Sequence, residues 1–134
     1  MSQETVEIVR ASTKAFLDGD AETALSALHP QVEWHATVGG IDEGRVYRGR
    51  EEVVQAFADY FATWERMEMR ADEYIDTDGD DVVVFFHEVA KGRESGVVVE
   101  TDTGTVNTVR DGLIVRVRSF MDRKQAVEAA GLSE

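Results

Sequence analysis

The stretch Val82-Val83-Val84-Phe85-Phe86-His87-Glu88 decides the fold of this chain. Its first five residues are apolar at both alternating positions, which is typical of a strand that is buried on both faces. Such a strand needs a cover on each side, so we expect helices on one face and a second copy of the chain on the other. His87 and Glu88 then point to opposite faces of the strand, so at most one of them enters a pocket on the helix side.

The composition predicts one domain, residues 1–134, and excludes several function classes. This length suits a single hydrophobic core. Cysteine is absent, which excludes disulfides, thiolate zinc sites and cysteine nucleophiles and favours a reducing cytoplasm. The net charge of -13, from 27 acidic and 14 basic residues, repels phosphate backbones and anionic lipids. No apolar stretch approaches the ~20 residues of a membrane span. We therefore expect neither nucleic acid nor a membrane as partner.

The spacing of apolar residues predicts the elements of the first half. Residues 6–16 have the three- and four-residue period of a helix, and a second short helix over 21–28 is capped by Asp20. Alternation over residues 32–38 predicts a strand with Trp34 directed inward. A short second strand at residues 46–47 precedes a helix whose apolar stripe is Val53, Phe57, Tyr60, Phe61 and Trp64.

Turn residues divide the second half into four strands. The turns are Asp78-Gly79, the segment 92–96 and Asp111-Gly112, of which the last is a strong two-residue hairpin signal. An antiparallel meander is the natural result. Asp122 with Gln125 three residues later then predicts the start of a terminal helix.

The order of these elements resembles the nuclear transport factor 2-like superfamily, specifically its SnoaL-like branch, over essentially the whole chain. The local marks are Val32-Glu33-Trp34-His35, Tyr47-Arg48-Gly49-Arg50-Glu51-Glu52, Asp78 to Val84, Ser95-Gly96, and Arg110-Asp111-Gly112 through Met121-Asp122-Arg123. The resemblance implies an α+β, cystatin-like fold: a curved antiparallel sheet wrapped around three helices as a cone, with a short C-terminal helix. It also implies a pocket for an apolar small molecule at the open end and a homodimer through the outer sheet face.

The characterised enzymes of this superfamily do not match the chain residue by residue. The aspartate base of ketosteroid isomerases falls at Trp34, and their second aspartate falls near Val106. The two aspartates and arginine of the epoxide hydrolases are not found either. The family therefore predicts a cavity and leaves the reaction open.

Three side chains are candidates for moving a proton: His87, His35 and Glu73. His87 is either a pocket residue or a hydrogen-bonded interface histidine. His35 alternates with Trp34 and shares the polar face of its strand. Glu73 shares a face with Met69, Ala71 and Ile75, where burial would destabilise its charged form, or it sits exposed at a fraying strand end.

Two function classes stay open. The first is a small-molecule enzyme that performs proton transfer, as an isomerase, cyclase or hydrolase, on an apolar, cyclic, carbonyl- or oxygen-bearing substrate. Trp34, Tyr60, Trp64 and Phe86 would shape its pocket. The second is a non-catalytic binding or dimerisation module. We expect no cofactor and no metal. The acidic run from residue 76 to 81 resembles the start of a calcium loop, but its glycine is misplaced, which favours a solvated hairpin turn.

Overall fold

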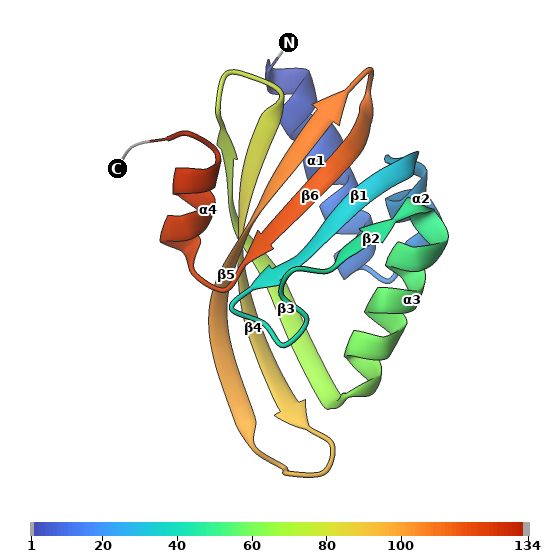
Figure 1. Ribbon diagram of the computed structural model, residues 1–134, viewed down its shortest axis with the longest axis vertical. Coiled ribbons are helices and arrows are strands. Elements are labelled where there is room, and N and C mark those ends of the chain that lie inside the picture. Colours follow the sequence, from blue (N-terminus) through green and yellow to red (C-terminus); the bar gives the residue numbers. More distant parts are fainter. Residues whose placement is uncertain (1, 133–134) are drawn as a thin grey trace.

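The computed structural model describes residues 2–132, which form four helices and six strands (Figure 1). The helices are α1 (Ser2–Leu17), α2 (Ala21–Ser26), α3 (Gly49–Ala62) and α4 (Arg123–Ala129). The strands are β1 (Leu28–Val38), β2 (Val46–Arg48), β3 (Trp64–Asp76), β4 (Asp81–Gly92), β5 (Val98–Arg110) and β6 (Leu113–Phe120). Within this part of the chain, none of the helices combines the length and the apolar character that crossing a membrane requires.

One open sheet of six strands organises the molecule, in the order β2-β1-β6-β5-β4-β3. Strands β3 to β6 form the expected antiparallel meander, and the β4–β5 hairpin extends beyond the helices (Figure 1). The pairing of β1 with β6 is parallel, with Trp34 beside Val117, so the expectation of an antiparallel sheet throughout is wrong at this one junction. A parallel pair needs a long connection, and here the whole of residues 39–112 supplies it.

The inner face of the sheet, defined as the face that packs against α1 and α3, contains the main core. Val82 and Val84 of β4 lie fully buried there, in one cluster with Val9 of α1 and Val53 of α3. Burying each such side chain contributes about 1.5–3 kcal/mol. The predicted helical spacing in α1 is thereby confirmed, because Val9, in the first half of this helix, belongs to the cluster.

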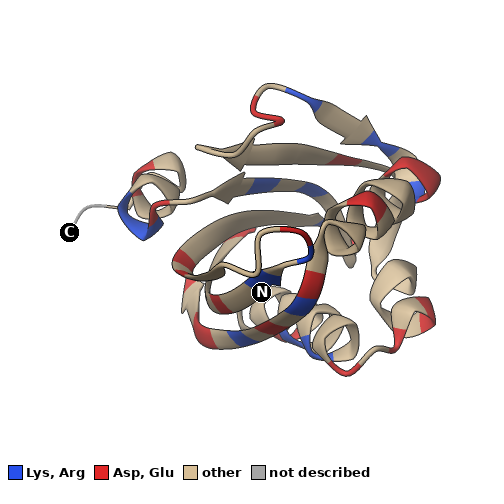
Figure 2. Cartoon of the chain, turned by 90° about the horizontal axis from the view of Figure 1, so that it is seen from below, with Lys and Arg blue, Asp and Glu red and all other residues tan. Residues whose placement is uncertain are grey.

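The outer face, the opposite side of the sheet, is covered in part by α4 (Figure 2). Val83 and Val106 pack there against Ala126 of α4, and all three are fully buried. The predicted burial of β4 on both faces is confirmed, and a second copy of the chain on the outer face stays a prediction. The chain's own C-terminal helix, rather than a second copy, buries Val83.

Helix α3 ends earlier than its apolar stripe suggests. Thr63 is its C-cap, and Trp64 is already the first residue of β3. Phe57 packs edge-on against Trp34 with ring centroids 5.0 Å apart, and Phe61 stacks on Phe57 at 5.9 Å. Phe57 therefore packs between α3 and β1, and Phe61 continues this aromatic layer to Phe16 of α1.

Candidate functional site

Strand β4 directs Glu88, and not His87, to the inner face. Val82, Val84 and Phe86 pack on the core beneath the helices, and Glu88 continues this alternation. His87 shares the outer face with Val83. The strand thus delivers a carboxylate toward the helices and an imidazole away from them.

The Glu88 carboxylate is held by two hydroxyl groups from different elements. The Tyr60 hydroxyl, in the last turn of α3, donates to Oε1 at 3.4 Å. The Thr103 hydroxyl of β5 donates to Oε2 at 3.1 Å. Trp64, at the start of β3, stands beside Tyr60 with ring centroids 6.2 Å apart. We call Tyr60, Trp64, Glu88 and Thr103 the Glu88 cluster.

Burial sets the acid–base chemistry of this cluster. Loss of solvent raises the pKa of the Glu88 carboxyl, and the hydrogen bonds from Thr103 and Tyr60 oppose that shift without cancelling it. Burial, together with the negative charge of Glu88, raises the pKa of Tyr60 to about 12. Glu88 is therefore a stronger base than an exposed glutamate, whereas the Tyr60 hydroxyl stays protonated at neutral pH and acts as a donor.

The indole N–H of Trp64 adds a second donor beside the Tyr60 hydroxyl. Its Nε1 atom is buried and makes no hydrogen bond of acceptable geometry to any of the described residues 2–132. It lies near enough to the Tyr60 hydroxyl to lower that group's pKa, an effect smaller than the opposing effect of burial. A buried donor without an acceptor costs free energy, and a ligand oxygen placed here would remove that cost.

The structure places His87 in an ionic network on the outer face. Its Nδ1 lies 2.6 Å from Asp102 Oδ1 and its Nε2 lies 3.2 Å from Glu100 Oε2. The hydrogen bond with Asp102 raises the pKa of His87, and the bond with Glu100 adds to this. Arg123 of α4 also contacts Asp102, at 3.3 Å, so the network fastens α4 to the sheet. Of the two interpretations of His87, the structure therefore favours a hydrogen-bonded histidine that lies away from the pocket.

His35 also faces away from the helices. It lies on the same side of β1 as Glu33, 3.4 Å from its Oε1, and Glu33 pairs with Arg48 of β2 at 2.7 Å. The alternation with Trp34 is as predicted, and it leaves His35 remote from the Glu88 cluster.

Glu73 lies on the opposite face from the one expected. A bulge between Ala71 and Glu73 shifts the register, so Ala71 pairs with Phe86 and Glu73 pairs with Phe85. The extra residue reverses the alternation, and Glu73 becomes exposed on the outer side. The expectation that it shares a face with Ala71 and Met69 is wrong for this reason.

The four expected pocket residues divide into two groups. Tyr60 and Trp64 belong to the Glu88 cluster, and Tyr60 is 42% exposed at its rim. Trp34 and Phe86 pack against the inner core. Their contact with a ligand stays a prediction.

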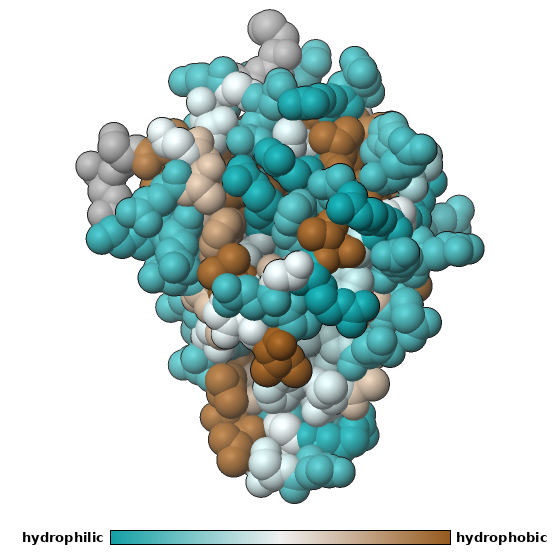
Figure 3. Space-filling view, in the orientation of Figure 1, coloured by the Kyte–Doolittle hydropathy of each residue, from teal (hydrophilic) through white to brown (hydrophobic). Residues whose placement is uncertain are grey.

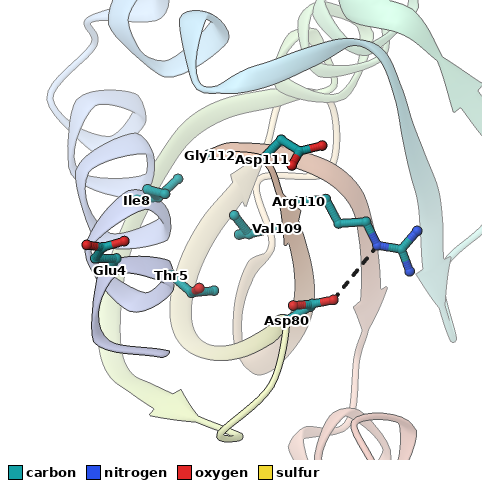
Figure 4. A pocket seen from close by; sticks show the side chains of 8 residues that line it. All are labelled: Glu4, Thr5, Ile8, Asp80, Val109, Arg110, Asp111 and Gly112. Carbon is teal, nitrogen blue, oxygen red and sulfur yellow. Dashed lines mark ion pairs between the residues drawn. The ribbon is translucent and has the colours of Figure 1, made fainter. Parts of the chain in front are cut away.

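Two surface hollows are found near α1, away from this cluster. The first is lined by side chains that include Glu4, Ile8, Asp80 and Asp111, with an ion pair of 3.9 Å between Arg110 and Asp80 (Figure 4). The second lies on the exposed side of α1. Neither is the expected hollow beside Trp34. Over residues 2–132, no group of three or more histidine or acidic side chains has an arrangement that could hold a metal ion.

Comparison with known proteins identifies the family. Residues 9–117 match the model of the SnoaL-like domain. The chain belongs to the SnoaL-like family. No curated protein sequence matches this chain significantly.

Solved structures of SnoaL-like and related proteins share the fold. TerC, crystallised with polyporic acid, is 28% identical, with a TM-score of 0.75 over 96% of this chain and 98% of TerC. An NTF2-like protein from Burkholderia thailandensis is 25% identical, with a TM-score of 0.81 over 96% and 98% of the two chains. A putative SnoaL-like polyketide cyclase from Jannaschia is 20% identical, with a TM-score of 0.74 over 98% and 94%. The predicted α+β fold of the SnoaL-like branch is thereby confirmed.

Proposed function

We propose that this SnoaL-like protein is a small-molecule enzyme of the isomerase or cyclase type. In this proposal the Glu88 carboxyl moves a proton on an apolar, cyclic, carbonyl-bearing substrate. The observation that carries it is the placement of Glu88 on the inner face, where burial raises its pKa and where Tyr60 and Thr103 orient both of its oxygens. Perturbed carboxylates of this kind are typical of acid–base sites.

The chemical step needs no co-reactant. The ionised Glu88 carboxylate takes a proton from a carbon next to the substrate carbonyl, and the C–H electron pair forms the double bond of an enolate. The carbonyl oxygen gains the negative charge and accepts a hydrogen bond from the Trp64 indole. The Tyr60 hydroxyl, which donates to the ionised Glu88, turns to this oxygen once Glu88 is protonated. In a substrate with a β,γ double bond the enolate is conjugated, so the protonated Glu88 can return its proton to the γ-carbon. The carbonyl then re-forms, the carbon–carbon double bond moves to the α,β position, and the Glu88 carboxylate is restored.

Family membership supports this assignment at a coarse level. The similar TerC was crystallised with polyporic acid, and the similar Jannaschia protein is named a putative SnoaL-like polyketide cyclase. Both concern small organic molecules, which agrees with an inner face of aromatic side chains and one buried acid. His87, His35 and Glu73 have no part in the proposed step.

Proton exchange at a simple ketone tests the proposal directly. The C1 protons of 2-tetralone are followed by NMR in deuterated buffer with wild-type protein, with Glu88→Gln, and with Glu73→Gln as a matched control on the exposed side. We expect wild type and Glu73→Gln to accelerate exchange and Glu88→Gln to lose about 10²-fold or more of that acceleration. Equal exchange with wild type and Glu88→Gln, or none above buffer with wild type, contradicts the proposed function.

A non-catalytic binding module is the second candidate, and one observation favours it. Phe16, Phe57 and Phe61 stack within 5.0 to 6.0 Å of one another and occupy the space beside α3. A filled interior leaves less room for a substrate. Binding of 2-tetralone without any exchange would support the module over the enzyme.

A further inference from the structure

The formal charges that act on Tyr60 of the Glu88 cluster are negative, and the one positive charge that acts on Glu88, from His87 on the outer face, has the smallest of the effects on its pKa. Glu88 itself is the first, 3.4 Å from the Tyr60 hydroxyl. Asp42, in the loop between β1 and β2, is the second, and its Oδ2 accepts a hydrogen bond of 2.7 Å from the Tyr47 hydroxyl. Both carboxylates act on Tyr60, and both raise its pKa. Asp59 of α3 adds a third negative charge that acts on Tyr47.

Asp42 is tied to the cluster through packed aromatic side chains. Tyr47 of β2 is paired with Trp34 of β1, and Trp34 packs on Phe57 at 5.0 Å. Phe61, one turn further along α3, contacts Tyr60 with centroids 5.7 Å apart. The loop that holds Asp42 therefore borders the same aromatic surface as Glu88.

The basic side chains near this surface have partners of their own, and one of them, Arg45, acts on Tyr47 and not on Glu88. The Arg45 guanidinium lies over the Tyr47 ring, 5.0 Å from its centroid. Arg93 donates to the carbonyl oxygens of Ala62 and Trp64, at 3.2 and 3.0 Å. Lys91 pairs with Glu65 at 3.3 Å. Across the molecule as well, acidic residues are spread over helices, strands and loops (Figure 2). No cation in these contacts is directed at Glu88.

We propose that the Glu88 cluster takes uncharged carbonyl compounds and excludes carboxylates, with Asp42 as a specificity-determining residue. This inference rests on the proposed function of that cluster and narrows its substrate class. An anion would lose its water shell on binding and would meet two carboxylates, while His87 lies on the opposite face of β4 and is paired there with Asp102. An uncharged carbonyl group instead offers an acceptor to the Trp64 indole and carries no such cost.

A matched pair of ligands tests the inference. 2-Tetralone is uncharged, and tetralin-2-carboxylate adds one negative charge to the same bicyclic skeleton. Each is titrated into ¹⁵N-labelled protein, and the indole ¹H–¹⁵N signal of Trp64 is followed. Trp34→Phe leaves a single indole signal and assigns it. At pH 7.5 we expect the ketone to bind about tenfold or more tightly than the carboxylate.

Two charge-neutralising variants locate the source of the selectivity. Asp42→Asn keeps an acceptor for the Tyr47 hydroxyl, and we expect it to tighten binding of the carboxylate about threefold while the ketone is unaffected. Asp111→Asn removes the same charge at the β5–β6 turn, at the other end of the sheet, and should change neither affinity (Figure 1).

Each outcome decides the proposal. The proposal is overturned if the two ligands bind equally tightly, or if the carboxylate binds more tightly. It is also overturned if the two variants have equal effects, or if neither ligand shifts the Trp64 signal. Failure of the proposed function has a different signature: 2-tetralone binds with the expected selectivity, yet its protons exchange no faster than in buffer.

Discussion

Replacing Gly104 by alanine should loosen the attachment of α4 to the outer face of the sheet. Gly104 lies in β5 between Phe85 of β4 and Phe120 of β6, directly under the helix. A Cβ atom at this position would stand 2.9 Å from the Cβ of Ala126 and 3.4 Å from the Phe85 ring. The Ala126 methyl cannot rotate away, because it is fixed to the helix backbone. The whole of α4 must therefore shift.

Two opposing effects decide the magnitude. Alanine is favoured over glycine in a strand by about 0.5–1 kcal/mol, because glycine loses more backbone entropy on folding. Overpacking a close-packed interior costs about 1–3 kcal/mol. The clash is the larger effect, so we expect a net loss of about 0.5–2 kcal/mol. For a domain of this size that corresponds to a melting temperature lower by about 2 to 10 °C.

Thermal unfolding followed by circular dichroism measures the change, and Gly79→Ala is the control. Gly79 lies in the β3–β4 turn, and the nearest atom to its added Cβ is Thr77 Oγ1 at 3.8 Å. Faster amide exchange at Ala126 and Ala130 should accompany the loss in Gly104→Ala. A Gly104→Ala variant as stable as wild type, with unchanged exchange in α4, would refute the placement of this helix.

Three further predictions concern charge and assembly. Glu88→Gln should raise the free energy of unfolding at pH 7, measured by urea titration, by about 0.5–2 kcal/mol, because it removes a buried charge at a functional position. An unchanged or lower urea midpoint argues against burial of that charge. The bonds of His87 with Asp102 and Glu100 raise its pKa in the folded protein, so their contribution is complete below the unfolded pKa of about 6.5 and is lost as the pH rises through the folded-state pKa. Urea midpoints of wild type should therefore fall more steeply over that window than those of His87→Gln, and parallel curves would contradict the network. Sedimentation velocity at micromolar concentration should show the predicted homodimer, and a clean monomer would leave α4 as the cover of the outer face by itself.

The exposed apolar side chains bear on whether the chain forms a homodimer. Exposed apolar side chains occur as small separate patches on a largely hydrophilic face, as Figure 3 shows. Val97, Val98 and Val99 near the tip of the β4–β5 hairpin are 57%, 62% and 42% exposed. Since α4 already covers Val83, the burial of β4 on both faces does not by itself require a dimer.

Local patterns predicted most of the elements correctly. The Asp111-Gly112 hairpin is present, and both residues have positive φ angles, 53° and 80°, as a two-residue turn of this kind requires. The Asp122 side chain caps α4 by accepting from the Lys124 amide at 2.8 Å. Such features depend on residues close in sequence, which is why the sequence alone suffices to find them.

The misplaced features depend on contacts between distant segments. The bulge that turns Glu73 outward has no glycine or proline to mark it. The role of α4 as a cover depends on the fit of Ala126 against Gly104, residues 22 positions apart by their numbers. Strand alternation separates His87 from Glu88, but only the packing of Val82 and Val84 on the helices shows which of the two faces inward.

A carboxyl titration by ¹³C NMR tests the central claim most directly. We predict that Glu88 titrates above the ordinary glutamate pKa of about 4.3, because burial disfavours its charge, while Asp102 in the same spectra titrates below its ordinary value because His87 hydrogen-bonds to it. A Glu88 pKa at or below the ordinary value would mean a solvated carboxylate, and the proposed acid–base site would not exist.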